Sequence, residues 1–335
     1  MRGNFNLNTL SVCIISKNEE KNLIKCLESI KDIADEIILV DTGSKDNTIP
    51  IAEKYNAKIV KFPWQNDFSS ARNKSLEMAS KDWILYIDSD ECLDNSQIYE
   101  IKKSLTSLDF IGVKLKPINV INNKPYVAKS TLRIIKNNCN FYFSGNINEK
   151  LLNSKYKNYE NKIKTTNYII YNYGFDYTNK TLTDRCNRNL DIYFSFPDKD
   201  KDYLYYYNVG NEYYLLKKYN LAATNYLKAL NLNNNTLINS YLTLLIVKSY
   251  YYQKKYTKAI LIGENFSIKY NLTREIYFLL SQCYRKLDEF NLSKEYFKTY
   301  LSYPSNEYSY YFTLINDKEN NLIPEFFGFS ILSLK

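Results

Sequence analysis

The residues best suited to chemistry lie directly after an apolar stretch, Trp83–Ile87, where the chain continues as Asp88-Ser89-Asp90-Glu91. Successive side chains of an extended chain point to opposite sides, so Asp88 and Asp90 would lie on the same side. Two carboxylates this close repel each other unless a cation or hydroxyl donors lie between them. Mg²⁺ is typically held by one or two protein carboxylates together with phosphate oxygens. The segment therefore predicts a divalent cation bound to a diphosphate, with a solvated turn as the alternative.

Two further polar segments follow apolar stretches nearer the N-terminus. The first contains Ser16, Asn18 and Glu19, where a helix is predicted to begin. Ser16 and Glu19 have the spacing of a helix capping box, a role that is compatible with a ligand contact. In the second segment, Gly43 allows a tight turn, and Asp41 is placed to accept a hydrogen bond from a ribose or a base. A turn without a ligand is the alternative for this second segment.

A third segment, Asp67–Asn73, supplies a cation. Arg72 lies near the beginning of a predicted helix. A guanidinium can form two parallel hydrogen bonds to a phosphate group, so Arg72 is a suitable partner for the same diphosphate. An ion pair at the surface is the alternative.

These segments are expected to meet because strands and helices alternate over the first ninety residues. Such alternation predicts an α/β fold with a parallel sheet, whose ligands gather at the carboxyl ends of the strands. The predicted strands are Leu10–Ser16, Glu36–Asp41, Ala57–Lys61 and Trp83–Asp88, and the predicted helices are Glu19–Ile30, Asp46–Tyr55 and Ser69–Ala79. Three later strands without helices between them predict an antiparallel extension: Phe110–Leu115, Thr131–Ile135 and Asn167–Tyr173.

The second half of the chain is predicted to be helical. Thr181–Phe196 is expected to be a connecting helix, followed by helices over residues 203–301. Aromatic and small residues recur there, with a spacing of 37 from Tyr213 to Tyr250 and of 34 from Tyr250 to Tyr284. A period near 34 with small residues in the second helix resembles tetratricopeptide helix pairs, with an ordinary helical bundle as the alternative.

Composition excludes several classes of protein. The 335 residues include 34 Tyr and no His, which rules out a Ser-His-Asp triad, a Cys-His dyad and an HExxH zinc site. The six cysteines form no CxxC pair, as expected for small buried side chains in a reducing compartment. The net charge of +9 accompanies a general abundance of Lys, Asn and Tyr, so a nucleic-acid partner is not expected. No stretch has the length of a signal-peptide core or a membrane span, and a cytoplasmic location is expected.

Four of these segments together resemble the nucleotide-sugar domain of family 2 glycosyltransferases, which have the GT-A fold. They are Val12–Glu20, Ile37–Thr48, Asp67–Asn73 and Trp83–Glu91, and the resemblance covers about residues 9–175. It implies that Asp41 and Arg72 contact the nucleotide of a UDP-sugar, that Asp88 lies near the ribose and that Asp90 binds Mg²⁺ or Mn²⁺ on the diphosphate. The predicted donor-binding residues are Ser16, Asn18, Glu19, Asp41, Gly43, Arg72, Asp88, Ser89 and Asp90, with Asp90 and Asp88 as the metal ligands.

Three later segments carry a narrower resemblance: Arg133–Asn137, Gly145–Glu149 and Tyr171–Gly174. They are similar to bacterial enzymes with Arg-Leu-Phe-Arg, Val-His-Glu and His-Tyr-Gly motifs and C-terminal tetratricopeptide helices. These enzymes include the peptide S-glycosyltransferases of glycocin bacteriocins and lipopolysaccharide-core glucosyltransferases. Both histidines are replaced, by Asn148 and Asn172. Asn is a poor ligand for transition metals and cannot act as a base, so metal binding is expected to favour Mg²⁺ over softer ions.

The reaction implied is an inverting, single-displacement transfer of a sugar, expected to be glucose, to a peptide side chain. The expected acceptor is a cysteine of a bacteriocin precursor. The metal, with Arg72 and Lys150, would neutralise charge on the departing diphosphate. Glu149 is the first candidate for the general base, and Glu91 the second.

The predicted organisation is a GT-A domain over residues 1–176, a linker over 177–202, tetratricopeptide-like repeats over 203–302 and a tail over 303–335 that caps the repeats or mediates a homodimer. A groove between stacked helix pairs would hold a peptide or protein acceptor. One alternative is a transferase that acts on a cell-surface saccharide or a lipopolysaccharide-type acceptor. Another is a non-catalytic peptide-binding scaffold, an idea motivated by the two missing histidines.

Overall fold

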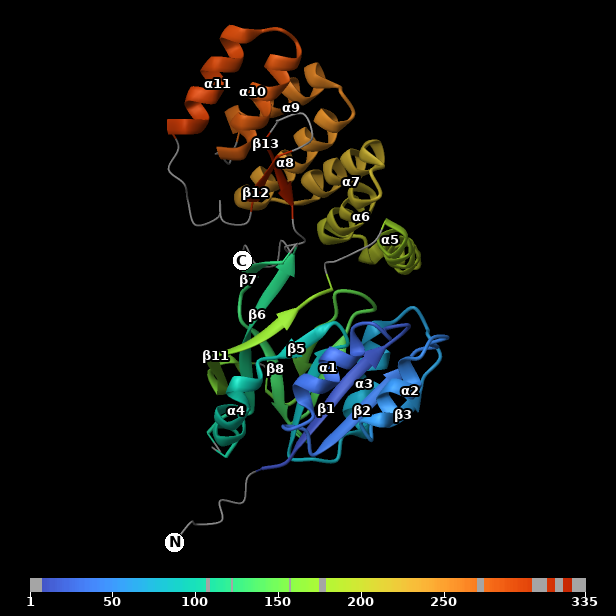
Figure 1. The fold of residues 1–335 in the computed structure, drawn as a ribbon. Coiled ribbons are helices and arrows are strands. Elements are labelled where there is room, and N and C mark those ends of the chain that lie inside the picture. The colour runs from blue at the N-terminus through green and yellow to red at the C-terminus, as the bar shows by residue number, and fades with distance from the viewer. Residues whose placement is uncertain are drawn as a thin grey trace. The chain divides into compact units, whose positions relative to one another are not determined.

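A computed structural model of the chain describes residues 8–106, 109–121, 123–156, 158–174, 179–269, 274–302, 312–316 and 322–326. The contacts within the chain divide it into two compact units, Met1–Thr178 and Asn179–Lys335 (Figure 1). The first unit has an α/β fold and the second is mainly helical, as the sequence predicts.

The first unit is built on a nine-stranded sheet with the order β3-β2-β1-β4-β8-β6-β11-β5, in which β7 also pairs with β6. The four predicted parallel strands are parallel neighbours. The second half of the sheet is mixed: β8 is antiparallel to β4 and β6, whereas β11 is parallel to β6 and not antiparallel as predicted. The strands are β1 Leu10–Ser16, β2 Glu36–Asp41, β3 Lys58–Lys61, β4 Trp83–Asp88, β5 Glu91–Leu93, β6 Gly112–Ile121, β7 Lys124–Val127, β8 Thr131–Lys136 and β11 Ile163–Asn172.

Both faces of this sheet are buried, which is why its central strands are nearly continuous apolar runs. Leu10, Val12 and Ile14 of β1 pack into one core, to which three of the helices contribute, while Cys13 faces a second core that includes Ala71 of the remaining helix. The three helices of the first core are α1 Leu23–Ile30, α2 Thr48–Lys54 and α4 Ile98–Ser104, and the helix of the second core is α3 Phe68–Met78.

The first helix begins four residues later than the sequence predicts, at Leu23 rather than at Glu19. The reason lies in the side chains at the start of α2. The N–H of Glu19 donates to Thr48 Oγ1 at 2.8 Å, and the N–H of Glu20 donates to Asp46 Oδ2 at 3.1 Å. These contacts tie the loop after β1 to the beginning of α2, so residues 19 and 20 form a turn and not helix.

A separate hairpin lies beside α3. Its strands, β9 Phe141–Ser144 and β10 Lys150–Asn153, pair with each other, and among the described residues they form no ladder with the large sheet. Five residues connect the two strands, and two of them have left-handed backbone conformations, Gly145 (φ 104°) and Asn148 (φ 53°). Asn is among the residues that tolerate this conformation, which fits its presence at position 148.

The second unit contains three consecutive helix pairs after the connecting helix α5. Small residues lie where the helices approach closely: a Cβ atom at Gly210 would overlap the ring of Tyr226, and one at Gly263 would overlap Leu280. The helices are α5 Asn179–Phe194, α6 Tyr203–Leu215, α7 Tyr219–Leu232, α8 Thr236–Tyr252, α9 Tyr256–Lys269, α10 Arg274–Lys286 and α11 Phe290–Ser302.

The turn inside each helix pair has the same geometry, which confirms the predicted repeat. Lys217, Lys254 and Asp288 have φ values of 58°, 59° and 61°, and each lies four residues after one of the recurring tyrosines. In each case the N–H of the residue after the left-handed position donates to the carbonyl of that tyrosine, at 2.9 to 3.0 Å. A left-handed residue with a hydrogen bond back across it is a common way to end a helix.

The predicted C-terminal tail falls mostly outside the described residues. Within it, β12 Phe312–Asn316 and β13 Leu322–Phe326 form an antiparallel pair. A role of this tail as a cap or a dimer contact stays a prediction. No helix among the described residues combines the length and the apolar character that crossing a membrane requires.

The cysteines give a prediction about reactivity. All six are free thiols, and four are buried. Burial raises the pKa of Cys13, Cys186 and Cys283 to about 12, so little thiolate forms at neutral pH. Maleimide at pH 7.5 should label half-buried Cys139 first, and should label the three buried thiols only after denaturation. Mass spectrometry of the labelled peptides measures this order, and rapid labelling of native Cys13 would contradict it.

The beginning of α3 gives a prediction about pH. The Asp67 carboxylate caps this helix, accepting from Ser70 N–H at 3.1 Å, Ser70 Oγ at 2.6 Å and Ser69 Oγ at 2.7 Å. Burial alone would raise the pKa of Asp67, but these hydrogen bonds lower it. Asp67→Ala should therefore lower the free energy of unfolding by about 1 kcal/mol at pH 7.

This stabilisation is present above the unfolded-state pKa of about 3.9 and is lost as pH falls through the lower folded-state pKa. The difference between the wild type and Asp67→Ala in urea denaturation should shrink below about pH 4. Asp67→Asn is the matched control, because an amide oxygen still caps the helix. A difference that grows as the pH falls would show that the carboxylate does not act as a charged cap.

Candidate active site

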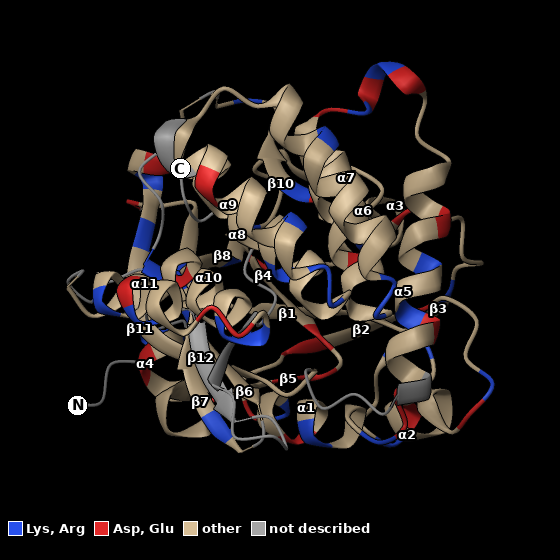
Figure 2. Ribbon diagram, turned by 90° about the horizontal axis from the view of Figure 1, so that it is seen from above, with Lys and Arg blue, Asp and Glu red and all other residues tan. Residues whose placement is uncertain are grey.

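The carboxyl ends of β1, β2 and β4 lie side by side at one edge of the sheet, where acidic residues gather (Figure 2). Ser16, the last residue of β1, is opposite Asp41, the last residue of β2. Ile15 is opposite Asp88, the last residue of β4. Three of the polar segments singled out in the sequence therefore meet at this edge.

Asp41 organises the turn after β2. Its Oδ2 accepts hydrogen bonds from the N–H groups of Gly43 and Ser44, both at 3.0 Å, and Gly43 has a φ of 107°. Asn18, with a φ of 57°, joins this turn to the loop after β1. Its N–H donates to Ser44 Oγ at 2.9 Å, and its Oδ1 accepts from the N–H of Lys45 at 2.8 Å. Asp41 and Asn18 thus hold the two loops in one arrangement.

Ser16 presents a hydroxyl group at the same edge. Its Oγ is buried and has no hydrogen-bond partner among the described residues. The predicted capping box with Glu19 is therefore not formed; Glu19 Oε2 instead accepts from Asn22 Nδ2 at 3.0 Å. Buried polar atoms without partners are uncommon in proteins, and this one marks a position where a ligand atom could bind.

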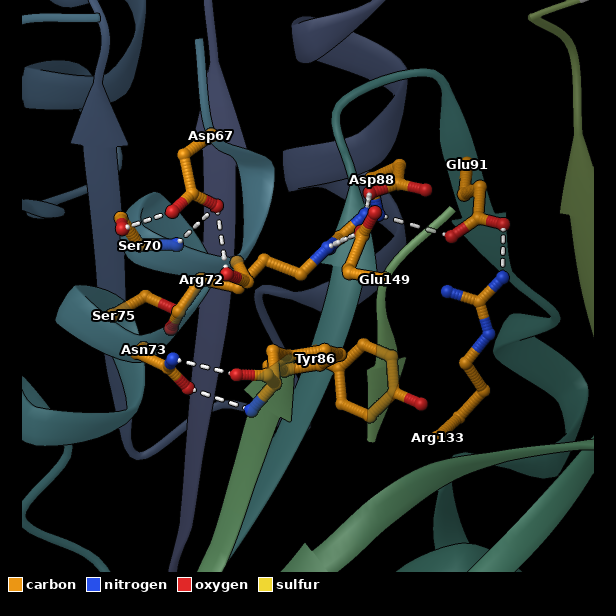
Figure 3. Close-up of polar contacts among 12 residues, drawn as sticks. Asp67, Ser70, Arg72, Asn73, Ser75, Tyr86, Asp88, Glu91, Arg133 and Glu149 are labelled. Carbon is orange, nitrogen blue, oxygen red and sulfur yellow. Dashed lines mark hydrogen bonds and ion pairs between the residues drawn. The ribbon is translucent and has the colours of Figure 1, made fainter. Parts of the chain in front are cut away.

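Arg72 lies between two carboxylates that come from distant parts of the chain (Figure 3). Its Nη2 donates to Asp88 Oδ1 at 2.8 Å, and its Nε donates to Glu149 Oε1. Burial opposes the charge of Arg72, but Asp88 and Glu149 raise its pKa, so the guanidinium stays charged. Burial alone would raise the pKa of Asp88, but Arg72 and then Arg133 outweigh it and lower that pKa. Arg72 and Glu149 are largely buried while Asp88 stays partly exposed, so the group is a partly buried network of ionised side chains.

Glu91 is fully buried, and both of its carboxylate oxygens have partners. Oε1 accepts from Arg133 Nη2 at 2.6 Å and from Asn172 Nδ2 at 3.4 Å, while Oε2 accepts from the N–H of Asp88 at 3.0 Å. Burial raises the pKa of Glu91; Arg133 lowers it and Asp88 raises it further. The structure therefore places Glu91 as an internal partner of Arg133 that also fixes the backbone of Asp88.

Asp90 differs from its neighbours, because no ion pair reaches its carboxylate from the residues the structure describes. Burial, followed by the charge of Asp88 and other carboxylates, raises the pKa of Asp90 to about 8. The Asp90 carbonyl accepts from the N–H of Tyr173 at 2.9 Å, and a Cβ atom at Gly174 would overlap Asp90 Oδ2. Glycine at 174 thus leaves room for this carboxylate, while Ser89 is buried in the intervening turn.

The charges of the cluster fit a divalent cation. Carboxylates outnumber guanidinium groups in the cluster, so a divalent cation would offset the repulsion that raises the pKa of Asp90 and would let this group ionise; the groups are Asp88, Asp90, Glu91 and Glu149 with Arg72 and Arg133. Within the described part of the chain, no three His, Cys, Asp or Glu side chains converge as a metal site. Mg²⁺ needs fewer protein ligands when phosphate oxygens complete its coordination. The residues present therefore fit an ion that binds together with a diphosphate.

Sequence reasoning missed the partners of the two arginines. Arg133 was part of a recognised motif, but its ion pair with Glu91 joins β8 to β5, a strand of three residues that was not predicted. Arg72 was expected to face a phosphate, and its contact with Glu149 depends on the separate hairpin. A single cation between apolar residues of a strand, as at Arg133, is the signal that could have indicated a buried acidic partner.

Comparison with protein families identifies both parts of the chain. The model for glycosyl transferase family 2 matches residues 11–175. The model for the tetratricopeptide repeat matches residues 203–236 and 275–307. The family and the repeats that the sequence motifs predict are thereby confirmed.

Individual relatives agree with this assignment. The chain is 29% identical over 237 residues to the SPbeta prophage-derived glycosyltransferase SunS of Bacillus subtilis, covering 69% of this chain and 55% of the relative. It is 30% identical over 179 residues to an uncharacterised glycosyltransferase of Rickettsia bellii, covering 52% of this chain and 56% of the relative. The chain thus spans about half the length of these relatives.

Among solved structures, S. aureus TarS is similar with a TM-score of 0.40 and 15% identity, covering 75% of this chain and 54% of that one. The arrangement of β1 to β4 with their crossover helices, and the family match over the same residues, agree with each other. The chain carries a family 2 glycosyltransferase domain of the GT-A fold over residues 11–175, followed by tetratricopeptide repeats.

Proposed function

We propose that the protein is an inverting glycosyltransferase, which moves a sugar from a nucleotide diphosphate sugar to a peptide side chain. One observation carries this proposal: an unpaired carboxylate, Asp90, lies beside a partly buried ionised cluster at the carboxyl edge of a family 2 sheet. Ligands of open parallel sheets gather at this edge.

The donor would bind along the loops after β1, β2 and β4. Hydrogen bonds of Asp41 to Gly43 and of Asn18 to Ser44 hold two of these loops together. The Ser16 hydroxyl beside them has no partner among the described residues. Asp90, with Asp88 beside it, would hold Mg²⁺ or Mn²⁺. When bound, such an ion supplies electrostatic stabilisation of the departing diphosphate.

Arg72 would bind the phosphate oxygens of the donor through its guanidinium group. Asp88 and Glu149 keep its guanidinium charged. When either carboxylate releases its hydrogen bond from Arg72, that N–H group can donate to a phosphate oxygen instead. Glu149 is favoured over Glu91 as the base that takes the proton of the acceptor. Glu91 is fully buried with both oxygens hydrogen-bonded, whereas Glu149 pairs with Arg72 alone among the described residues and lies on a hairpin outside the large sheet.

The proposed acceptor is a cysteine of a peptide. Three helix pairs with the same turn stack in the second unit, and such repeats form grooves that hold extended or helical peptides. The motif resemblance to peptide S-glycosyltransferases points to a thiol. A thiol also places less demand on a base, because at pH 7 a few per cent is already thiolate.

The test of the proposed function is Asp90→Ala. Release of UDP from UDP-glucose, measured with Mg²⁺ or Mn²⁺ in the presence of a cysteine peptide, should fall about 10²–10³-fold because stabilisation of the leaving group is lost. Glu160→Gln is the matched control; the exposed Glu160 carboxylate pairs only with half-buried Lys114 in the described structure, and its loss should leave the rate unchanged. Full turnover and full donor affinity in Asp90→Ala would reject the proposed site.

The acceptor class can be tested with Glu149→Gln. The amide oxygen can still accept from Arg72, so the variant removes the base with little change in packing. Transfer to a serine peptide should fall about 10²–10⁴-fold, and transfer to a cysteine peptide should fall much less. Mass spectrometry of both products measures the two losses. Comparable losses with both acceptors would remove this argument for a thiol.

A further inference from the structure

The position of Glu149 depends on a hairpin that forms no hydrogen-bonded ladder with the main sheet in the described part of the chain. Its strands β9 and β10 pair with each other, and Glu149 directly precedes β10. A two-stranded hairpin by itself is at best marginally stable in water. Packing against the sheet and contacts with α3 must therefore fix where the Glu149 carboxylate lies.

The most specific of these contacts comes from Asn73 on α3. Its Nδ2 donates to the carbonyl of Phe143 at 2.9 Å, and its Oδ1 accepts from the N–H of Phe143 at 2.7 Å. Phe143 lies in the middle of β9. An asparagine side-chain amide has an N–H donor and a carbonyl acceptor, as a peptide group does. Asn73 therefore pairs with the backbone of Phe143 as a residue of a neighbouring strand would.

Further aromatic and polar contacts surround Asn73 and Phe143. The Phe143 ring is buried and meets the ring of Tyr86 edge to face, with centroids 5.0 Å apart and planes at 88°. The guanidinium of Arg72 lies over the same ring at 5.4 Å. One turn earlier on the helix, the N–H of Phe68 donates to the carbonyl of Asn146 in the hairpin loop at 2.9 Å. The first residue of α3 thus contacts the loop of the hairpin, and the middle of α3 contacts its strand.

The pairing of β9 with β10 restricts the backbone conformation between Phe143 and Glu149. Phe143 pairs with Leu151 across the hairpin, and Ser144 pairs with Lys150. The loop between them contains the two left-handed residues, Gly145 and Asn148, which limit its conformations. Fixing the backbone of Phe143 therefore fixes the backbone beside Glu149.

We propose that Asn73 is a positioning residue, which acts through β9 to hold Glu149 where it can take the proton of the acceptor. The proposal rests on the proposed function of Glu149. Asn73 itself makes no contact with donor or acceptor in this account. Its effect should therefore appear in turnover and in the coupling to Glu149, and not in donor binding.

The experiment compares Asn73→Ala, Asn73→Asp and the control Asn137→Ala. Asn137 also makes two hydrogen bonds from its side-chain amide to backbone carbonyls, those of Ala79 and Lys81, but at the start of β4. Hydrogen exchange of the peptide containing Phe143 reports the attachment of the hairpin. Steady-state transfer to a cysteine or serine peptide gives kcat and the donor KM, and Glu149→Gln is combined with each variant.

Asn73→Ala should speed exchange at Phe143 and lower kcat about 10–100-fold, because a small displacement of a catalytic group has a large effect on rate. The donor KM should change less than about twofold. In the Glu149→Gln background the same substitution should have no further effect on kcat. Asn73→Asp, which keeps the acceptor for the Phe143 N–H, should fall between the wild type and Asn73→Ala, and Asn137→Ala should match the wild type.

Unchanged kcat in Asn73→Ala, or an equal loss with and without Glu149, would overturn the proposal. A loss shared by Asn137→Ala would do the same, since it would show a general effect on folding. Absence of transfer by the wild type would reject the proposed function and with it the role given to Glu149. In that case the exchange rates at Phe143 still decide whether Asn73 holds the hairpin.

Discussion

The charge network that joins Asp88, which is partly exposed, to Glu91, which is fully buried, is the constraint on which the first unit depends. Taking a carboxylate out of water costs several kcal/mol unless a counter-ion and hydrogen bonds compensate it. Arg72 comes from α3 and Arg133 from β8, and each serves a carboxylate on or next to β4. These ion pairs therefore bring α3, β8 and the end of β4 together at one edge of the sheet, although the three elements are separate in sequence. Glu149 extends the same network to the hairpin.

Local patterns in the sequence were enough to predict the parts of this arrangement that follow from periodicity. Three of the four strands from Leu10 to Asp88, namely β1, β2 and β4, are largely buried on both faces, so each is a nearly continuous apolar run, and the polar residues that end them had to meet at one edge. The repeat of the helical unit was equally visible, because a tyrosine recurs before the turn of each helix pair. These features are set by a few residues that are close in the chain.

The remaining features depend on contacts between distant residues. Arg72 and Glu149 are 77 positions apart, and Arg133 and Glu91 are 42 positions apart. No local pattern indicates that a cation expected to face a phosphate lies between two carboxylates. The direction of β11 could not be predicted either, because it depends on the path of the chain through β9 and β10. The start of α1 was misplaced for a similar reason, since side chains of α2 hold the preceding residues.

The common turn of the helix pairs has a consequence for how this protein could have diversified. Each pair closes on itself through one left-handed residue and one hydrogen bond to a tyrosine carbonyl, so its internal geometry does not depend on how many pairs precede it. Duplication or deletion of a pair by recombination would lengthen or shorten the stack without altering the fold of any single pair. Evolution could thus adjust the reach of the helical unit in steps of about 34 residues while leaving the sequence of the sheet untouched.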